Sequence, residues 1–136
     1  MKRKNGNQRR RPDIPPPGRK MSEMVLEFAS EFINTAKTLE EKHTRLTVAC
    51  SAWNMACSPL DVRTRMLERY ISGYRSHCPG RTDEEMAAIR QDIETLIREK
   101  LSLFPTVTKQ IANAQVRRTP DGDKIDVASV TVIQKP

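Results

Sequence analysis

Along the chain, one segment is apolar on almost every side when its residues are placed at helical spacing, and it covers residues 46–57. Its only polar positions are Thr47, Ser51 and Asn54, and it carries Trp53, the only tryptophan of the sequence. A helix that is apolar all round is typical of a buried element. We therefore expect a central helix from about residue 40 to 57, with the other elements packed around it.

Three further segments each show a single apolar stripe, which is the pattern of a one-sided surface helix. We expect these helices over about residues 22–37, 59–77 and 83–104. Ser22 is a good N-cap for the first, and Thr82 with Glu85 forms a capping box before the last. The connections are short, which favours antiparallel neighbours. The predicted fold class is therefore mainly α, a four-helix domain around a buried central helix.

The hydrophobic period changes to two after Lys109, and the sequence TPDGD at residues 119–123 predicts a β-hairpin turn. We expect a C-terminal β-hairpin over about residues 109–133. A three-residue loop would set Arg118 opposite Lys124, two like charges, so we expect a two- or four-residue loop. That register pairs Arg117 with Asp126, Val116 with Val127, and Ile111 with Val132.

The hairpin also indicates where a partner could bind. A two-stranded hairpin is marginally stable alone, so it should lean on the helices or pair with another strand. An unpaired strand edge offers backbone donors and acceptors to a second chain. We expect the free edge of this hairpin to bind a protein partner or to mediate self-association.

The net charge of +7 is confined to one end of the chain. Residues 1–20 hold eight basic residues and one acidic residue, whereas residues 21–136 hold 16 of each kind. The first segment is polar and proline-rich, so we expect a disordered basic arm over residues 1–20, followed by a single domain over 21–136. The expected contacts to an acidic partner or a nucleic acid are Lys2, Arg3, Lys4, Arg9, Arg10, Arg11, Arg19 and Lys20.

The three cysteines do not predict a disulfide framework. Cys50 and Cys57 lie seven positions apart on one helix, roughly 10 Å at 1.5 Å per residue, which is too far for a bridge. They indicate a reducing compartment. The basic N-terminus lacks an apolar core, so we expect no secretory signal, and no apolar stretch reaches the roughly 20 residues of a membrane span. We expect a cytoplasmic protein without membrane contact.

Candidate chemistry in the sequence has a simpler interpretation at each position. His43, Cys50 and Cys57 share one line of the central helix, but spacings of roughly 10 Å prevent them from binding one metal ion. His77 and Cys78 lack a second ligand pair such as C-x-x-C. Arg63 falls inside an apolar stripe, where its side chain either reaches solvent or contacts an anion. No nucleophile elbow, glycine-rich loop or paired acids occur, so we assign no catalytic, cofactor-binding or metal-binding residues and expect no enzyme.

Four segments together carry a resemblance: MVLEFA at residues 24–29, AWNMA at 52–56, EKLSLFP at 99–105 and VAS at 127–129. They resemble a group of short uncharacterised bacterial helical proteins of no known function. The resemblance covers most of the chain after residue 20. It implies a bacterial, cytoplasmic setting and supplies no activity.

Taken together, these patterns predict a non-enzymatic binding or accessory protein that acts through protein–protein contacts, with its basic arm touching an acidic partner. The alternative is an RNA- or DNA-binding accessory factor that uses the arm for phosphate contacts. A third possibility is an enzyme whose site has no recognisable motif.

Overall fold

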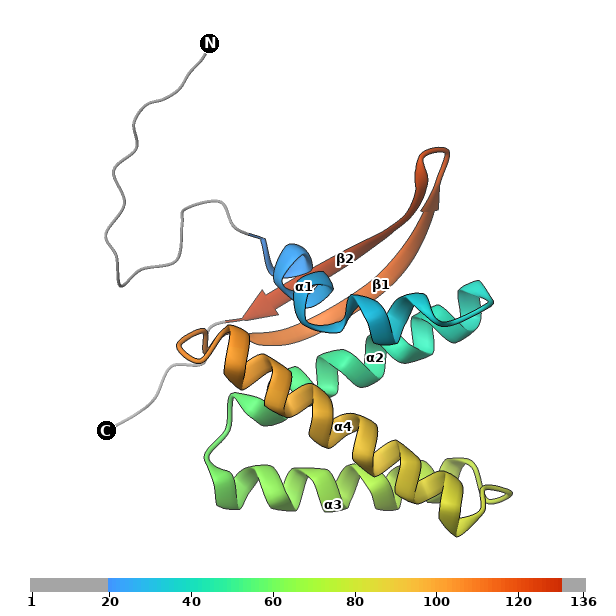
Figure 1. Ribbon diagram of the computed structural model, residues 1–136, viewed down its shortest axis with the longest axis vertical. Coiled ribbons are helices and arrows are strands. Elements are labelled where there is room, and N and C mark those ends of the chain that lie inside the picture. The colour runs from blue at the N-terminus through green and yellow to red at the C-terminus, as the bar shows by residue number, and fades with distance from the viewer. Residues whose placement is uncertain (1–19, 131–136) are drawn as a thin grey trace.

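The computed structural model describes residues 20–130 and confirms the mainly α fold class (Figure 1). Four helices precede one antiparallel hairpin, as predicted. Their bounds are α1 Met21–Asn34, α2 Leu39–Ala56, α3 Leu60–His77, α4 Asp83–Leu103, β1 Gln110–Thr119 and β2 Gly122–Val130. Residues 1–19 of the predicted arm over residues 1–20, and residues 131–133 at the predicted end of the hairpin, lie outside the described residues.

The helix starts follow local capping chemistry, with one correction to the sequence prediction. Thr82 and Glu85 form the predicted capping box at the start of α4, where the Glu85 N–H donates to Thr82 Oγ1 at 3.1 Å and the Thr82 N–H donates to Glu85 Oε1 at 2.8 Å. Ser22 is not the N-cap of α1, because the helix begins at Met21. The backbone N–H of Lys20, the residue before the helix, instead donates to the Glu23 carboxylate at 3.3 Å. An acidic side chain in the first turn therefore accepts a hydrogen bond from the backbone at the start of α1.

The predicted central helix is α2, and its second half forms the middle of the core. Trp53 is fully buried. Its ring meets Phe28 of α1 edge-on at 5.4 Å between centroids and Phe104, which follows α4, at 5.8 Å. Ile93 of α4 and Val25 of α1 are also fully buried. The large indole therefore joins α1, α2 and the end of α4 into one core.

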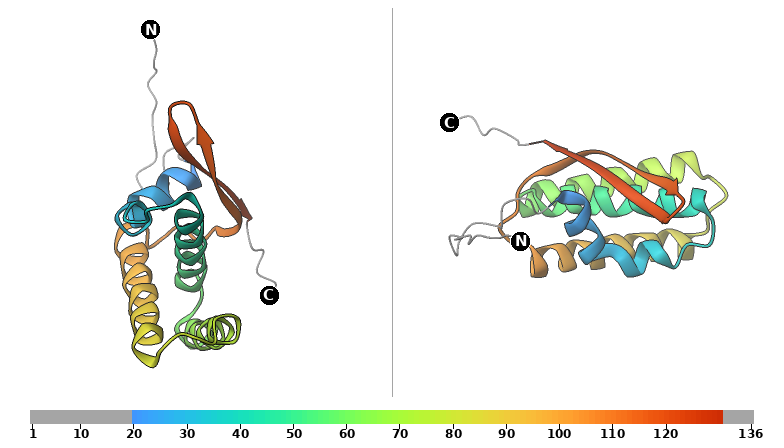
Figure 2. Two further views of the ribbon diagram at one scale, coloured as in Figure 1. Left: turned by 90° about the vertical axis from the view of Figure 1, so that its right-hand side faces the viewer. Right: turned by 90° about the horizontal axis from the view of Figure 1, so that it is seen from above.

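The hairpin and α3 lie at opposite ends of the molecule (Figures 1 and 2). The helix α3 buries only Leu67 and Ile71 against its neighbours. The hairpin packs with β1 along α2 and with β2 near α1. Lys42 of α2 forms an ion pair of 3.0 Å with Asp123 near the hairpin tip, so the hairpin is attached at its far end as well as at its base.

The predicted strand register is wrong by two residues. Thr119 pairs with Gly122 across a two-residue Pro120-Asp121 turn, so Arg117 lies opposite Lys124. Gly122 has φ 116°, a conformation that favours glycine and explains why the turn closes there. The shift is two over residues 113–119, which keeps those side chains on their predicted faces. Beyond an irregularity between Ile111 and Asn113 the shift is three, because Ile111 pairs with Ser129 and not with Val132.

The predicted register brings Arg117 and Asp126 together, and these two residues still form an ion pair, diagonally across the two strands. Arg117 Nε lies 2.8 Å from Asp126 Oδ2, although Asp126 is two residues further along β2 than Lys124, the residue opposite Arg117. Diagonal neighbours are within reach of long side chains. The turn therefore decides the register, and Arg117 reaches the same acid without direct pairing.

Candidate functional site

The base of the hairpin is anchored to α2 by side chains that hydrogen-bond its backbone. Asn54 binds both backbone groups of Ile111, accepting from the N–H at 2.7 Å and donating to the C=O at 2.9 Å. Trp53 Nε1 donates to the Lys109 carbonyl at 2.8 Å. Because Asn54 fills the hydrogen-bonding positions that a neighbouring strand would use, it occupies the outer edge of β1 at Ile111.

The backbone geometry of Ile111 identifies the groups that β2 leaves open. Both hydrogen-bonding groups of Ile111 point to Asn54, so Ile111 and Ser129 face each other without exchanging backbone bonds. Bonded and non-bonded positions alternate along an antiparallel strand. The N–H and C=O groups of Ile125, Val127 and Ser129 therefore point away from β1. Among the described residues, no strand pairs with this edge.

A groove of about 570 Å³ runs between the start of α1 and β2, and we call it the α1–β2 groove. Its walls include four consecutive residues of β2, 124–127, which come from both faces of the strand. A groove lined by both faces of a strand follows the edge of that strand. Met24, Ile125 and Val127 supply its apolar part, and Lys20, Lys109 and Lys124 supply positive charge.

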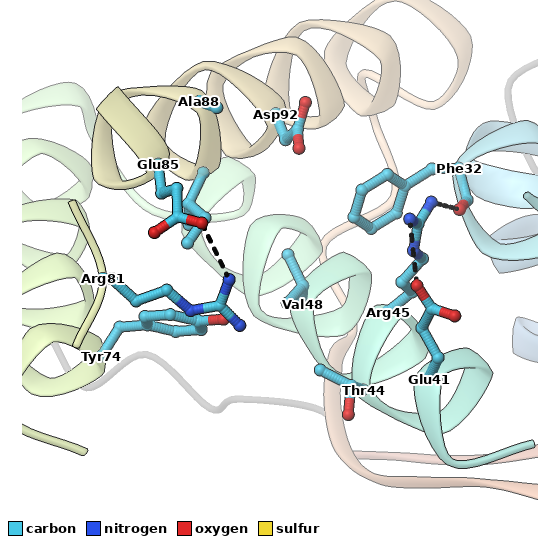
Figure 3. A pocket seen from close by; sticks show the side chains of 11 residues that line it. Phe32, Glu41, Thr44, Arg45, Val48, Tyr74, Arg81, Glu85, Ala88 and Asp92 are labelled. Carbon is cyan, nitrogen blue, oxygen red and sulfur yellow. Dashed lines mark hydrogen bonds and ion pairs between the residues drawn. The ribbon is translucent and has the colours of Figure 1, made fainter. Parts of the chain in front are cut away.

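A second hollow, of about 340 Å³, lies between α2, α4 and the end of α3 (Figure 3). Its two arginines already have partners within the chain. Arg45 donates to the Phe32 carbonyl at 2.9 Å and lies over the Phe32 ring, and Arg81 lies over the Tyr74 ring with Glu85 3.8 Å away. These contacts hold the helices together and leave neither guanidinium unpaired for a ligand.

Sequence reasoning missed Lys100, whose side chain is only 1% exposed. Its Nζ donates to the Val107 carbonyl at 2.6 Å and lies 5.1 Å from the centroid of the Trp53 ring. Burial lowers the pKa of Lys100, with a further contribution from the nearby charge of Arg63. The signal was present in the sequence, because position 100 follows Leu96 and Ile97 at helical spacing on the buried stripe.

Cys57, which lies beside this lysine, and Cys50 are both poorly suited to nucleophilic chemistry. Burial raises the pKa of Cys57, although Lys100 partly opposes the rise. Burial raises the pKa of Cys50 to about 12. A thiol needs a lowered pKa to supply a reactive thiolate at neutral pH. Trp53, Cys57 and Lys100 therefore have a structural role. Their side chains bind the Val107 and Lys109 carbonyls and so hold the connection over residues 104–109 against the core.

The structure describes only one member of the predicted basic contact set. Lys20 is exposed and stands at the entrance to α1. The other predicted contacts, Lys2, Arg3, Lys4, Arg9, Arg10, Arg11 and Arg19, lie outside the described residues.

The remaining sequence candidates have local structural contacts. Arg63 binds the end of α2, where Nη2 donates to the Ser58 carbonyl at 3.0 Å and Nε to the Met55 carbonyl at 3.3 Å, and the residue is half-buried. His77 Nδ1 is 3.0 Å from the Gly73 carbonyl within its own helix. Within residues 20–130, no group of three or more His, Cys, Asp or Glu side chains could hold a metal ion.

In the part of the chain that the structure describes, no helix has the length and apolar content needed to cross a membrane. Comparisons with known protein families, with curated proteins and with solved structures each find no match.

Proposed function

We propose that this chain is a non-enzymatic binding protein that acts through protein–protein contacts, with the outer edge of β2 as its binding surface. The observation that carries the proposal is the open row of backbone groups at Ile125, Val127 and Ser129 beside the α1–β2 groove. The basic segment over residues 1–20 would add long-range attraction to an acidic partner.

The anchoring of β1 supports this role. Its edge is occupied at Ile111 by Asn54, and the hairpin tip is tied to α2 by Lys42 and Asp123. Within the part of the chain that the structure describes, the hairpin is thereby held on the helices and has two strands only. A rigid hairpin with one open edge suits strand addition, in which main-chain hydrogen bonds supply affinity and side-chain pockets supply specificity.

We also propose a bacterial cytoplasmic setting, supported by the sequence resemblance and by three free cysteines, Cys50, Cys57 and Cys78. Free thiols persist in a reducing compartment. Secretion of the mature chain into an oxidising compartment, shown by fractionation of the host, would contradict this setting.

Proline substitution tests the binding surface, because proline has no N–H to donate. Val127→Pro and Ser129→Pro each remove an outward N–H, whereas Ala128→Pro removes an N–H from the internal ladder. We expect the first two variants to remain folded and to lose partner capture or self-association, measured by pull-down with cross-link mapping and by sizing. We expect Ala128→Pro to lower the melting temperature.

The paired edge variants separate backbone from side-chain effects. Val127 is a half-buried apolar residue, so its replacement also removes packing, whereas Ser129 contributes little apolar contact. If both edge variants stay folded and keep every interaction of the wild type, strand addition through β2 is wrong. The outer faces of the helices would then be the surfaces to test.

The alternative, an RNA- or DNA-binding accessory factor, is favoured by the position of the net charge in residues 1–20. Deletion of residues 1–19 should leave the melting temperature nearly unchanged and abolish any salt-sensitive binding to mixed RNA. The alternative gains support if the wild type binds RNA with a steep salt dependence while Val127→Pro and Ser129→Pro change nothing. It is contradicted if the wild type shows no RNA binding at low salt.

A further inference from the structure

The charges that line the α1–β2 groove are not balanced within the described residues. Lys20, Lys109 and Lys124 line it, and none of them has an ion-pair partner among residues 20–130. The one acidic residue of the lining, Asp126, already binds Arg117 through two contacts of 2.8 and 3.2 Å. The groove therefore has a local excess of positive charge, although the domain as a whole is neutral.

This groove differs in that respect from several charged surfaces of the domain, where the basic side chains have acidic or aromatic partners. Lys42 is paired with Asp123, and Arg90 is paired with Glu68 at 2.6 Å. The two arginines of the hollow in Figure 3 have aromatic and acidic partners within the chain. Within residues 20–130, the α1–β2 groove thus brings three lysines without ion-pair partners around one strand edge.

The same groove offers apolar contact and backbone hydrogen bonds. Met24 is buried at its α1 side, while Ile125 and Val127 are half-buried on β2. The outward N–H and C=O groups of residues 125, 127 and 129 are spaced to pair with an extended chain. Along such a chain, successive side chains point to opposite faces, so alternate residues can meet apolar and charged surroundings.

We propose that the α1–β2 groove binds an extended acidic segment of a partner protein, which adds to β2 as a third strand. The backbone of the segment would bond the outward groups of β2, and its carboxylates would lie beside Lys20, Lys109 and Lys124. This inference rests on the proposed function and adds the chemistry of the partner.

Charge favours an acidic partner segment over two other extended chains that could enter the groove, the protein's own basic arm and the β2 strand of a second copy. The rest of the basic arm, residues 1–19 with seven basic residues and one acidic residue, would be repelled by the three lysines. A second copy of the domain that paired β2 with β2 would bring two identical lysine groups together at the interface. An acidic segment instead supplies negative charge beside the three lysines, so the groove favours it over both.

Synthetic peptides on the full-length chain test this proposal. The probes are a capped heptapeptide of alternating glutamate and valine, its lysine–valine counterpart, and its serine–valine counterpart. We expect the glutamate peptide to bind most tightly, by fluorescence anisotropy, and to shift the backbone amide resonances of Ile125, Val127 and Ser129. Affinity should fall with added salt, because the attraction is between exposed charges.

Two triple variants provide a matched control for charge. Substitution of Lys20, Lys109 and Lys124 by Gln should weaken binding of the glutamate peptide by about tenfold, since each exposed ion pair changes the affinity by roughly a factor of two. The control variant replaces Lys37, Arg69 and Arg98 by Gln. It removes the same charge from residues outside the groove lining and should leave the affinity nearly unchanged.

The outcomes separate failure of this inference from failure of the proposed function. If all three peptides bind equally and Val127→Pro and Ser129→Pro abolish their binding, the edge binds strands and the acidic selectivity is wrong. If the glutamate peptide binds equally well to wild type and both proline variants, or no peptide binds, strand addition itself is wrong. If single-stranded RNA shifts the same three amide resonances and no peptide does, the groove binds a nucleic acid and the proposed acidic segment is wrong.

Discussion

Asn54 of α2 pairs with Ile111 of β1 as a neighbouring strand would, through one accepted bond of 2.7 Å and one donated bond of 2.9 Å. A single amide side chain can do this because it carries both a donor and an acceptor. The contact attaches the hairpin to the buried helix and occupies the edge of β1 at that point. At Ser129, opposite Ile111, the edge that no strand pairs with among residues 20–130 is that of β2.

Removal of the Asn54 amide should weaken the attachment of the hairpin. Asn54→Ala leaves the N–H and C=O of Ile111 without partners in a part-buried position, and each such loss costs about 1 to 3 kcal/mol. We expect the free energy of unfolding to fall by about 2 to 4 kcal/mol in denaturant titration. The Ile111 amide should also exchange faster with deuterium.

A matched substitution controls for the loss of an asparagine. Asn34 is exposed at the last position of α1, so Asn34→Ala should change the free energy of unfolding by less than about 0.5 kcal/mol. If Asn54→Ala and Asn34→Ala have the same small effect, water replaces the amide and Asn54 does not anchor the hairpin.

Trp53 should be the side chain whose truncation costs most. Its ring is fully buried, and Trp53→Ala should lower the free energy of unfolding by about 3 to 5 kcal/mol. Trp53→Phe retains most of the apolar contact and loses the bond from Nε1 to the Lys109 carbonyl, so its cost should be smaller. A thermal or denaturant midpoint for Trp53→Ala within error of the wild type would contradict the buried position.

The buried thiol of Cys50 should make the fold sensitive to alkaline pH. Burial raises its pKa from 9.0 to about 12, so between these values the unfolded chain loses the thiol proton while the folded chain keeps it. The associated stabilisation is complete below pH 9 and is lost as pH rises, by about 1.4 kcal/mol per pH unit above 9. Cys50→Ala should lack this slope, and parallel slopes for both proteins between pH 8 and 10.5 would contradict the prediction.

Lys100 should have the opposite pH dependence. Its pKa in the folded chain is lowered by burial, so between that value and 10.5 the unfolded chain binds more protons than the folded chain. The free energy of unfolding of the wild type, relative to that of Lys100→Met, should therefore rise with pH across that window. Denaturant titrations in a Cys57→Ala background, which removes ionisation of the neighbouring thiol, measure the difference directly. A difference that is constant from pH 7 to 10.5 would show that Lys100 is not desolvated.

The helices and the central core were predictable because they depend on local spacing and capping. The apolar pattern around Trp53 identifies a buried helix, and the Thr82 and Glu85 pair marks the start of α4, since both signals are contained within a few residues. The hairpin was predictable from its two-residue period and its turn sequence. Its register was not, because direct and diagonal charge pairs favour different pairings and the conformation of Gly122 decides between them.

The open strand edge and the chemistry beside it depend on contacts between segments far apart in the sequence. Asn54 and Ile111 are separated by 57 positions, so no local pattern indicates which edge of the hairpin is occupied. Lys20, Lys109 and Lys124 likewise come together only when the start of α1 lies beside β2. Burial of Lys100 requires the Val107 carbonyl and the Trp53 ring to receive its ammonium group at the same place. Such arrangements arise only when the helices and the hairpin pack, because packing brings these distant groups within hydrogen-bonding and ion-pairing distance.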